Sequence, residues 1–230
     1  MFVKICGIAN EEDALLAVAL GADALGFVFA PGSPRQVSPA DVAPILRRLP
    51  ATITTVGVFR DERPERVVDI VNTLGLRGAQ LHGREPASEV RWVRERVPMV
   101  IQGFSAGDPG IESVAEGGAD LVLVDAAEPG SGRAFDWALA DGVPPGMRML
   151  LAGGLTPDNV ADAIRRVRPW GVDVSTGVET TPGSGRKDAA RLRRFIEAVR
   201  ATEAELALDG WDPDDDSVGP YDWQVDERRA

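Results

Sequence analysis

A second cysteine is missing from this 230-residue sequence, so an internal disulfide bond is impossible. Disulfides are typical of oxidising compartments, and a chain of this length can bury a large core without them. The N-terminal residues also lack the basic segment and long apolar stretch that form a signal peptide. We therefore expect a protein of the cytoplasm.

Long apolar runs and an excess of positive charge are missing as well. The run ALLAVALGA lies between Asp13 and Asp23 and is far shorter than the roughly 20 residues that cross a bilayer. The net charge is −11, and ten acidic but only two basic residues fall within 201–230. We expect neither a membrane nor a nucleic acid as a partner, because a nucleic-acid surface would require clustered basic residues.

What the sequence does contain is a regular alternation of two kinds of segment. Short apolar runs are followed by longer stretches with helical spacing. Near-continuous apolar runs are typical of strands that are covered on both faces, as in parallel sheets. Eight segments have this character: 2–8, 24–30, 52–59, 78–82, 99–105, 119–126, 149–154 and 171–177.

The segments between these runs carry signals for helix starts and ends. Asn10 can cap a helix over 11–21, and Ser38-Pro39 opens one that reaches about residue 49. Gly75 follows a helical pattern over 63–74. Further helices are expected over 156–167 and 187–206, a weaker one over 108–117 and a short one over 135–141.

Eight strand–helix units in roughly 200 residues predict a single (β/α)8 TIM barrel over residues 1–206. An open doubly wound sheet is the alternative. Such a sheet rarely needs eight regular units, and the dinucleotide-binding pattern G-x-G-x-x-G is absent after the first strand.

Residues 207–230 form a short acidic C-terminal extension that does not continue the pattern. The segment has turn residues and acids but no periodicity, so we expect a solvated tail that adds little to the core. The alternative is that its aromatic residues Trp211, Tyr221 and Trp223 attach it to the barrel or to a partner.

In a (β/α)8 barrel the active site is built at the C-terminal ends of the strands. Because side chains alternate along a strand, Lys4 and Cys6 share one face, and Asp173 and Ser175 share another. The first and last strands are neighbours in a closed barrel, so we predict that Lys4 and Asp173 form a buried ion pair. The same reasoning brings Gln80 with His82, and Asp125 at the end of LVLVD, to the barrel mouth.

Cys6 and Asp125 are the candidate catalytic residues. Cys6 is either a small buried hydrophobe or a thiolate favoured by the nearby Lys4 cation. Asp125 is either a structural cap or an acid whose pKa is raised by its apolar surroundings. Together they could take a proton from carbon and deliver a proton to oxygen.

Two glycine-rich turns follow the last two predicted strands, in LLAGGLTPDNV and VDVSTGVE. Phosphate sites of these barrels use the loops after strands seven and eight, where backbone N–H groups face the anion. The alternative is two turns without a ligand. The candidate phosphate-binding residues are Gly153, Gly154, Ser175, Thr176 and Gly177.

Several motifs, in order along residues 2 to about 200, resemble phosphoribosylanthranilate isomerases of tryptophan biosynthesis. They are VKICGI, GADALGFVFAPGSPRQVSP, VGVF, AQLHG, VDA…GSGRAFDW, LAGGLTPDNV and GVDVSTGVE…PG…KD.

The resemblance implies an Amadori rearrangement of N-(5-phosphoribosyl)anthranilate to 1-(2-carboxyphenylamino)-1-deoxyribulose 5-phosphate, with no metal and no cofactor. It makes Asp125 the general acid and Cys6 the general base. Arg35 would pair with the anthranilate carboxylate, and His82 and Gly132 would belong to the substrate-binding face. The sequence departs from the family at Pro129–Gly132 and in the long turn TTPGSGRKD.

Two other functions are compatible with the barrel. The histidine-pathway isomerase, or an enzyme that performs both reactions, uses a pair of aspartates, one of them where this chain has Cys6. A silent barrel that binds a phosphorylated ligand is the other, and the joint presence of Cys6, Asp125 and Arg35 argues against it. The partner expected is a small phosphorylated substrate. The sequence leaves open whether the chain is a monomer or a homodimer, and whether it serves primary or secondary metabolism.

Overall fold

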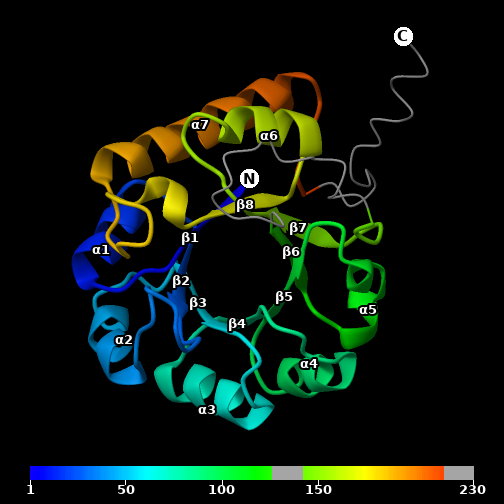
Figure 1. Ribbon diagram of the computed structural model, residues 1–230. Helices are drawn as coiled ribbons and strands as arrows, with labels where there is room; N and C mark the ends of the chain where they lie inside the picture. The colour runs from blue at the N-terminus through cyan, green and yellow to red at the C-terminus, as the bar shows by residue number, and fades with distance from the viewer. Residues whose placement is uncertain (126–141, 215–230) are drawn as a thin grey trace.

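A computed structural model describes residues 1–125 and 142–214 of the chain. Strands β1 to β8 follow one another around a closed, all-parallel barrel, and helices surround it (Figure 1). The predicted (β/α)8 barrel is therefore confirmed. The strands are β1 Phe2–Cys6, β2 Ala24–Val28, β3 Thr54–Phe59, β4 Gly78–Leu81, β5 Val100–Ser105, β6 Leu121–Asp125, β7 Arg148–Leu151 and β8 Gly171–Val174.

The helices begin and end largely where the sequence predicts. The Asn10 side chain accepts the Asp13 N–H at the start of α1, and Ser38 and Asp41 form a reciprocal capping box on α2. The helical segments are α1 Glu11–Ala19, α2 Pro39–Leu46, α3 Pro64–Leu74, α4 Ala87–Arg94, α5 Val114–Gly117, α6 Val160–Val167, α7 Ala189–Leu208 and the 3-10 turns η1 Pro109–Ser113 and η3 Thr176–Val178.

Some predicted boundaries are wrong, and α4 was not predicted. Only Val90 and Val93 of α4 are buried, so its apolar signal is weak. Helix α6 begins at Val160 rather than at Thr156, because the Asn159 side chain accepts the Thr156 N–H and holds this turn outside the helix. The predicted helix over 135–141 lies outside the described residues.

Several predicted strands end too late, and the residues beyond the observed ends include the site candidates His82, Gly153, Gly154 and Ser175–Gly177. Gly7 has a φ of 75°, a left-handed conformation that ends β1 at Cys6. Strand β8 ends at Val174, and a 3-10 turn follows from Thr176. These two strands therefore stop where the backbone leaves the extended conformation, and the turns that follow lie at the barrel mouth.

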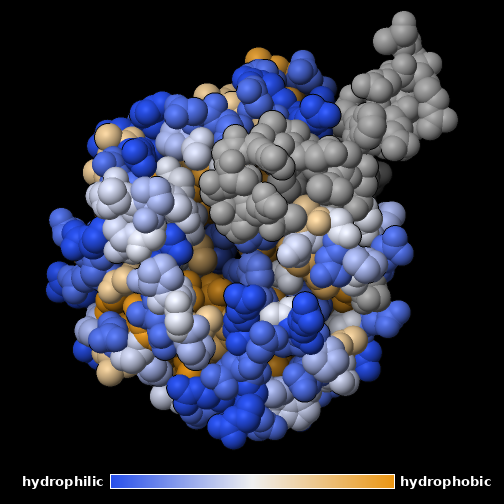
Figure 2. All heavy atoms as spheres, viewed as in Figure 1, coloured by the Kyte–Doolittle hydropathy of each residue, from blue (hydrophilic) through white to orange (hydrophobic). Residues whose placement is uncertain are grey.

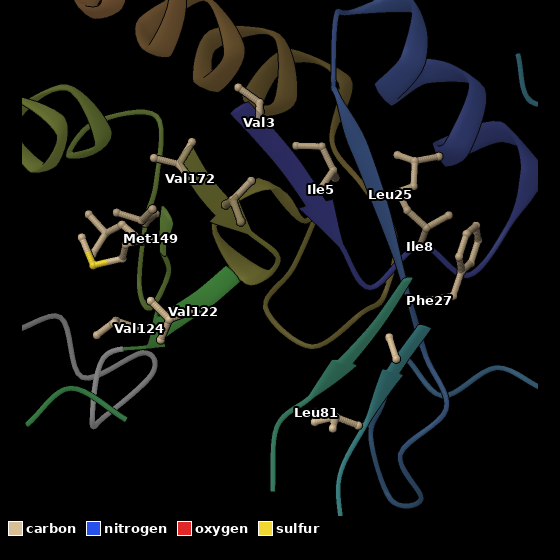
Figure 3. Packing of buried hydrophobic residues seen from close by; sticks show 14 of the residues in the cluster. Val3, Ile5, Ile8, Leu25, Phe27, Leu81, Val122, Val124, Met149 and Val172 are labelled. Atoms are coloured by element: carbon tan, nitrogen blue, oxygen red, sulfur yellow. The ribbon is translucent and has the colours of Figure 1, made fainter. Parts of the chain in front are cut away.

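Most of the core lies between the barrel and the helices. Buried residues of the strands, such as Val3, Ile5 and Leu25, belong to one large cluster with residues of the helices (Figure 3). A smaller apolar cluster, which includes Val56, Ile101 and Leu123, fills the barrel itself. The surface over the ring of helices is mostly hydrophilic (Figure 2). In the described part of the chain, no helix combines the length and the hydropathy needed to span a membrane.

The chain after α7 returns to the N-terminal end of the barrel. Trp211 packs against the large core cluster, and the Trp170 indole donates to the Asp214 carboxylate at 2.9 Å. The Trp170 ring stacks on Phe2, with the Arg148 guanidinium 5.3 Å from its centre. Trp211 thus lies on the barrel, as the second interpretation of the extension proposes, whereas Tyr221 and Trp223 lie outside the described residues. The division of the chain at residue 206 stays a prediction.

Candidate active site

The C-terminal ends of the strands bring the candidate residues to one end of the barrel. Cys6 is the last residue of β1 and Asp125 the last of β6, while His82 directly follows β4 and Ser175 directly follows β8. These residues come from distant parts of the sequence. The closed strand order therefore confirms that the predicted positions surround a common opening.

Lys4 and Asp173 form the predicted ion pair across the β1–β8 seam. The two residues are register partners, and the Lys4 ammonium lies 2.8 Å from the Asp173 carboxylate. Lys4 is fully buried and Asp173 is buried. The carboxylate raises the pKa of Lys4 despite burial, which pushes in the opposite direction, so this lysine stays charged inside the barrel.

Cys6 sits directly above this ion pair, and its ionisation is set by opposing effects. A Cβ placed on Gly26 would lie 3.0 Å from the thiol sulfur and 3.2 Å from the Lys4 ammonium, so both groups lie over this glycine. Burial raises the pKa of Cys6, and the Lys4 cation offsets only part of that rise. Lys4 thus lowers the pKa of the thiol, as the second interpretation of Cys6 requires, but desolvation has the larger effect.

Asp125 faces the imidazole of His82. The His82 Nε2 lies 3.8 Å from the Asp125 carboxylate, and the Gln80 amide nitrogen lies 2.9 Å from His82 Nδ1. Since an amide nitrogen only donates, Nδ1 accepts and Nε2 carries the proton that points toward Asp125. Burial lowers the pKa of His82, so the ring is neutral at pH 7. The expectation of a raised pKa for Asp125 stays a prediction.

Arg35 reaches the same end of the barrel from the loop after β2. Its Nε and Nη2 lie 2.5 Å and 2.9 Å from the two carboxylate oxygens of Glu179, and Nη2 also donates to the Thr176 hydroxyl at 2.8 Å. The Arg35 stem lies over Gly7, where a Cβ would collide with it. The guanidinium is thus held in one orientation by a buried carboxylate.

The two glycine-rich turns have the geometry of an anion site. Gly153 and Gly154 adopt φ values of 89° and 61°, which favour glycine. A Cβ on Gly177 would collide with the Leu155 carbonyl, so the turns after β7 and β8 touch at this point. The buried Ser175 hydroxyl has no hydrogen-bond partner among the residues that the structure describes. Such a hydroxyl is suited to a ligand oxygen.

Sequence reasoning did not single out Glu179 and Lys187, which the structure buries directly behind the strand ends and Arg35. Both are buried, and the Lys187 ammonium lies 3.5 Å from the Glu179 carboxylate. The two residues form an antiparallel bridge that closes the turn TTPGSGRKD. Charged residues eight positions apart, on either side of a glycine-rich turn, are the one sequence signal of this pairing.

The structure does not test the predictions about the loop at 129–132 or about metals and cofactors. Gly132 and the altered loop at 129–132 lie outside the described residues. In the described part of the chain, no three side chains of His, Cys, Asp or Glu gather where they could hold a metal ion. The absence of a metal and of a cofactor stays an expectation.

Comparison with known proteins gives one consistent result. A family model described as N-(5'phosphoribosyl)anthranilate (PRA) isomerase matches residues 3–198. The N-(5'-phosphoribosyl)anthranilate isomerase of Pelobacter propionicus is 45% identical over 207 residues, which are 88% of this chain and 97% of that protein.

Solved structures agree with this match. One is a phosphoribosyl anthranilate isomerase in complex with reduced 1-(o-carboxyphenylamino)-1-deoxyribulose 5-phosphate; it is 40% identical, with a TM-score of 0.76 over 87% of this chain and 99% of that one. Another holds generated monomers of the dimeric enzyme from Thermotoga maritima; it is 39% identical, with a TM-score of 0.75 and the same coverage. From the motifs, the barrel and these matches together, the chain belongs to the N-(5'-phosphoribosyl)anthranilate isomerase family.

Proposed function

We propose that this chain catalyses the Amadori rearrangement of N-(5'-phosphoribosyl)anthranilate to 1-(2-carboxyphenylamino)-1-deoxyribulose 5-phosphate in tryptophan biosynthesis. The observation that carries the proposal is the placement of Cys6 and Asp125 at the ends of β1 and β6, around one opening, in a chain of this family. A protein acid and a protein base are sufficient for this reaction.

The first step is assigned to Asp125. Its carboxyl group protonates the ring oxygen of the furanose, so that the C1–O bond breaks and the anthranilate nitrogen forms an iminium at C1. The neutral His82, whose Nε2 lies 3.8 Å from the Asp125 carboxylate, would stabilise the carboxylate that this step leaves by moving within hydrogen-bond distance. The role of His82 in substrate binding stays a proposal.

The second step is assigned to Cys6. Its thiolate removes the proton from C2, and the electrons of the C–H bond neutralise the iminium to give an enolamine. The enolamine then tautomerises to the ketose, with loss of the C2 hydroxyl proton and gain of a proton at C1. Because burial raises the pKa of Cys6, the charge of Lys4 is needed to keep the thiolate accessible near neutral pH.

Protein residues are assigned to the two ends of the substrate, the phosphate and the anthranilate carboxylate. The turns with Gly153, Gly154 and Ser175–Gly177 would accept the phosphate through backbone N–H groups and hydroxyls. Arg35, oriented by Glu179, would pair with the anthranilate carboxylate. The choice between monomer and homodimer stays open.

The test is turnover of the proposed substrate. Purified protein receives N-(5'-phosphoribosyl)anthranilate, formed in place from anthranilate and phosphoribosyl pyrophosphate, and the loss of substrate fluorescence is followed. Asp125→Asn is the matched control, since the amide cannot deliver a proton. We expect turnover by the wild type, little by the variant, and rescue of a tryptophan auxotroph that lacks this isomerase.

Two outcomes would contradict the proposal. Turnover of the histidine-pathway substrate without turnover of the anthranilate substrate would favour the alternative isomerase. Tight binding of a product analogue by a wild type that shows no turnover would favour the silent barrel. Retention of the wild-type rate by Asp125→Asn would leave the reaction intact but require a different acid.

A further inference from the structure

The β1–β8 seam ends in two carbonyl groups that face the same cation. The last register pair of the seam is Ile5 with Val174, and the next residues along the two strands are Cys6 and Ser175. The Lys187 ammonium donates to the Cys6 carbonyl at 2.7 Å and to the Ser175 carbonyl at 3.2 Å. Two carbonyls cannot bond to one another, so the ammonium bridges a gap in the barrel wall beside the thiol.

The same residue also holds the far end of the loop that follows Cys6. The Lys187 backbone N–H donates to the Asp13 carboxylate at 3.0 Å, and this carboxylate accepts from the Asn10 amide at 2.7 Å. Asn10 in turn caps α1. The loop 7–10 is therefore held at both ends by one residue, at its start through the ammonium and at its end through the backbone.

A buried carboxylate compensates the charge of Lys187. Glu179 lies 3.5 Å from the ammonium on one side and pairs with Arg35 on the other. It also accepts the Gly183 N–H at 2.8 Å. Because every charge in this network has a partner, the ammonium can remain buried beside the strand ends.

We propose that Lys187 is a positioning residue for Cys6: it fixes the end of β1, and with it the thiol, by bridging the Cys6 and Ser175 carbonyls. This inference rests on the proposed role of Cys6 as the base. Lys187 acts through the backbone and through its charge, and it is assigned no contact with the substrate.

The use of lysine at this position fits the task. The chain has only two lysines, Lys4 and Lys187, against 23 arginines, and both lysines are buried at the β1–β8 seam. An ammonium is a compact point charge with three rotatable donors, whereas a guanidinium is a planar fork. The gap between two carbonyls and a carboxylate therefore suits lysine and would not accept arginine without displacement of the strand end.

The charges that face the Cys6 thiol come from three places. Lys4 on β1 and Lys187 ahead of α7 lower its pKa, while Asp173 on β8 raises it, against the larger rise caused by burial. Loss of the Lys187 charge should therefore raise the pKa of Cys6 further. Since Cys6 is the only cysteine, its ionisation can be measured without interference from other thiols.

The experiment compares Lys187→Met with Lys187→Arg, and uses Arg193→Met on the exposed side of α7 as the control for loss of a positive charge. Thiolate absorbance and the rate of alkylation are followed against pH, and kcat and KM are measured separately. We expect kcat of Lys187→Met to fall by about 10- to 100-fold with KM little changed, since a displacement of about 1 Å can cost about 100-fold. The midpoint of thiol ionisation should rise by about one pH unit.

Lys187→Arg keeps the charge and changes the geometry, so its kcat should fall while the thiol midpoint moves less. If Lys187→Met does not fold, the double variant Lys187→Met/Glu179→Gln is compared with Glu179→Gln alone, and kcat and the thiol midpoint are the two readouts, because the loss of Glu179 itself affects KM through Arg35. If Lys187→Met keeps the wild-type kcat and the wild-type thiol midpoint, the proposal is overturned. The same holds if the variant loses thermal stability while kcat and the thiol midpoint stay unchanged. Absence of turnover in the wild type would refute the proposed function instead, and the thiol titration would still test whether Lys187 acts on Cys6.

Discussion

The two ends of the barrel are built on different principles. At the C-terminal end, buried charges hold one another, as in the Arg35–Glu179–Lys187 network, and glycines with positive φ turn the chain. At the N-terminal end, Trp170 stacks on Phe2 and donates a hydrogen bond to Asp214 from the chain after α7, and ion pairs there, such as Arg200–Asp23, are more exposed.

The difference shows how the fold separates two tasks. Networks of buried charge orient reactive groups but depend on each partner, because a charge left alone in the interior is strongly destabilising. Aromatic stacking and apolar packing stabilise the fold without constraining chemistry. Changes at the C-terminal end should therefore affect turnover first, and changes at the N-terminal end should affect only stability.

Cys6→Ser should separate turnover from stability most clearly. A hydroxyl is too weak an acid to supply an anionic base at neutral pH, so kcat should fall by about 100- to 10,000-fold. The side chains have nearly the same size, and Tm should stay close to that of the wild type. Steady-state kinetics and calorimetry on one preparation provide the test. A near-normal kcat would remove Cys6 from the mechanism.

Lys4→Met should affect both stability and turnover, because Lys4 lies below the site but inside the barrel. The variant leaves Asp173 buried without its partner and should lower the free energy of unfolding by about 3–5 kcal/mol. The pKa of Cys6 should rise as well.

The matched control for Lys4→Met is Lys4→Met/Asp173→Leu. Since it leaves no unpaired charge, it should recover most of the stability but not the activity. If the single and double variants are equally stable in urea unfolding, the unpaired Asp173 charge is not the cause of the stability lost in Lys4→Met.

Arg35→Ala tests whether the arginine at the mouth recognises the aromatic end of the substrate. KM for the anthranilate substrate should rise by about 100-fold, while inhibition by ribulose 5-phosphate should change little, because Arg35 is assigned to the carboxylate and not to the phosphate. Glu179→Gln, which keeps Arg35 but loosens its orientation, should show a smaller effect in the same direction. Equal losses for both ligands would show that the assignment is wrong.

The pH dependence of kcat/KM should report the buried thiol. The proposed mechanism needs Cys6 deprotonated and Asp125 protonated, so kcat/KM should follow a bell-shaped curve against pH, with one limb set by Cys6. Burial raises the pKa of Cys6 above its ordinary value, so the limb that reports the thiol should lie above about pH 8.5. A thiol limb near pH 7 would contradict a pKa raised by burial.

The smallest effects are expected from truncation of the C-terminal extension. The sequence alone predicts that removal of 208–230 leaves folding and kcat/KM nearly unchanged. In the structure, however, Trp211 packs against the large core cluster, and Trp170 donates a hydrogen bond to Asp214. Deletion of 215–230 should leave Tm and kcat/KM unchanged, whereas deletion of 209–230 should cost about 1–3 kcal/mol of stability without loss of kcat. Thermal melts of the two truncated forms, side by side with the full chain, decide between these outcomes.

The sequence by itself determined the barrel and most of its helix boundaries. Continuous apolar strands, caps such as Asn10 and Ser38, and the stop at Gly75 are local features, and local features can be read from the order of residues. Strand alternation and barrel closure also predicted the Lys4–Asp173 pair, because both rules hold for any closed parallel barrel.

Only the tertiary structure decided which charges meet and which effect prevails at Cys6. The contact of Lys187 with the Cys6 carbonyl joins residues 181 positions apart, and the Arg35–Glu179 pair joins residues 144 positions apart. No local pattern encodes such distances. The balance between burial and nearby cations at the thiol depends on how completely the surrounding chain excludes water, which is a property of the folded barrel and not of any segment.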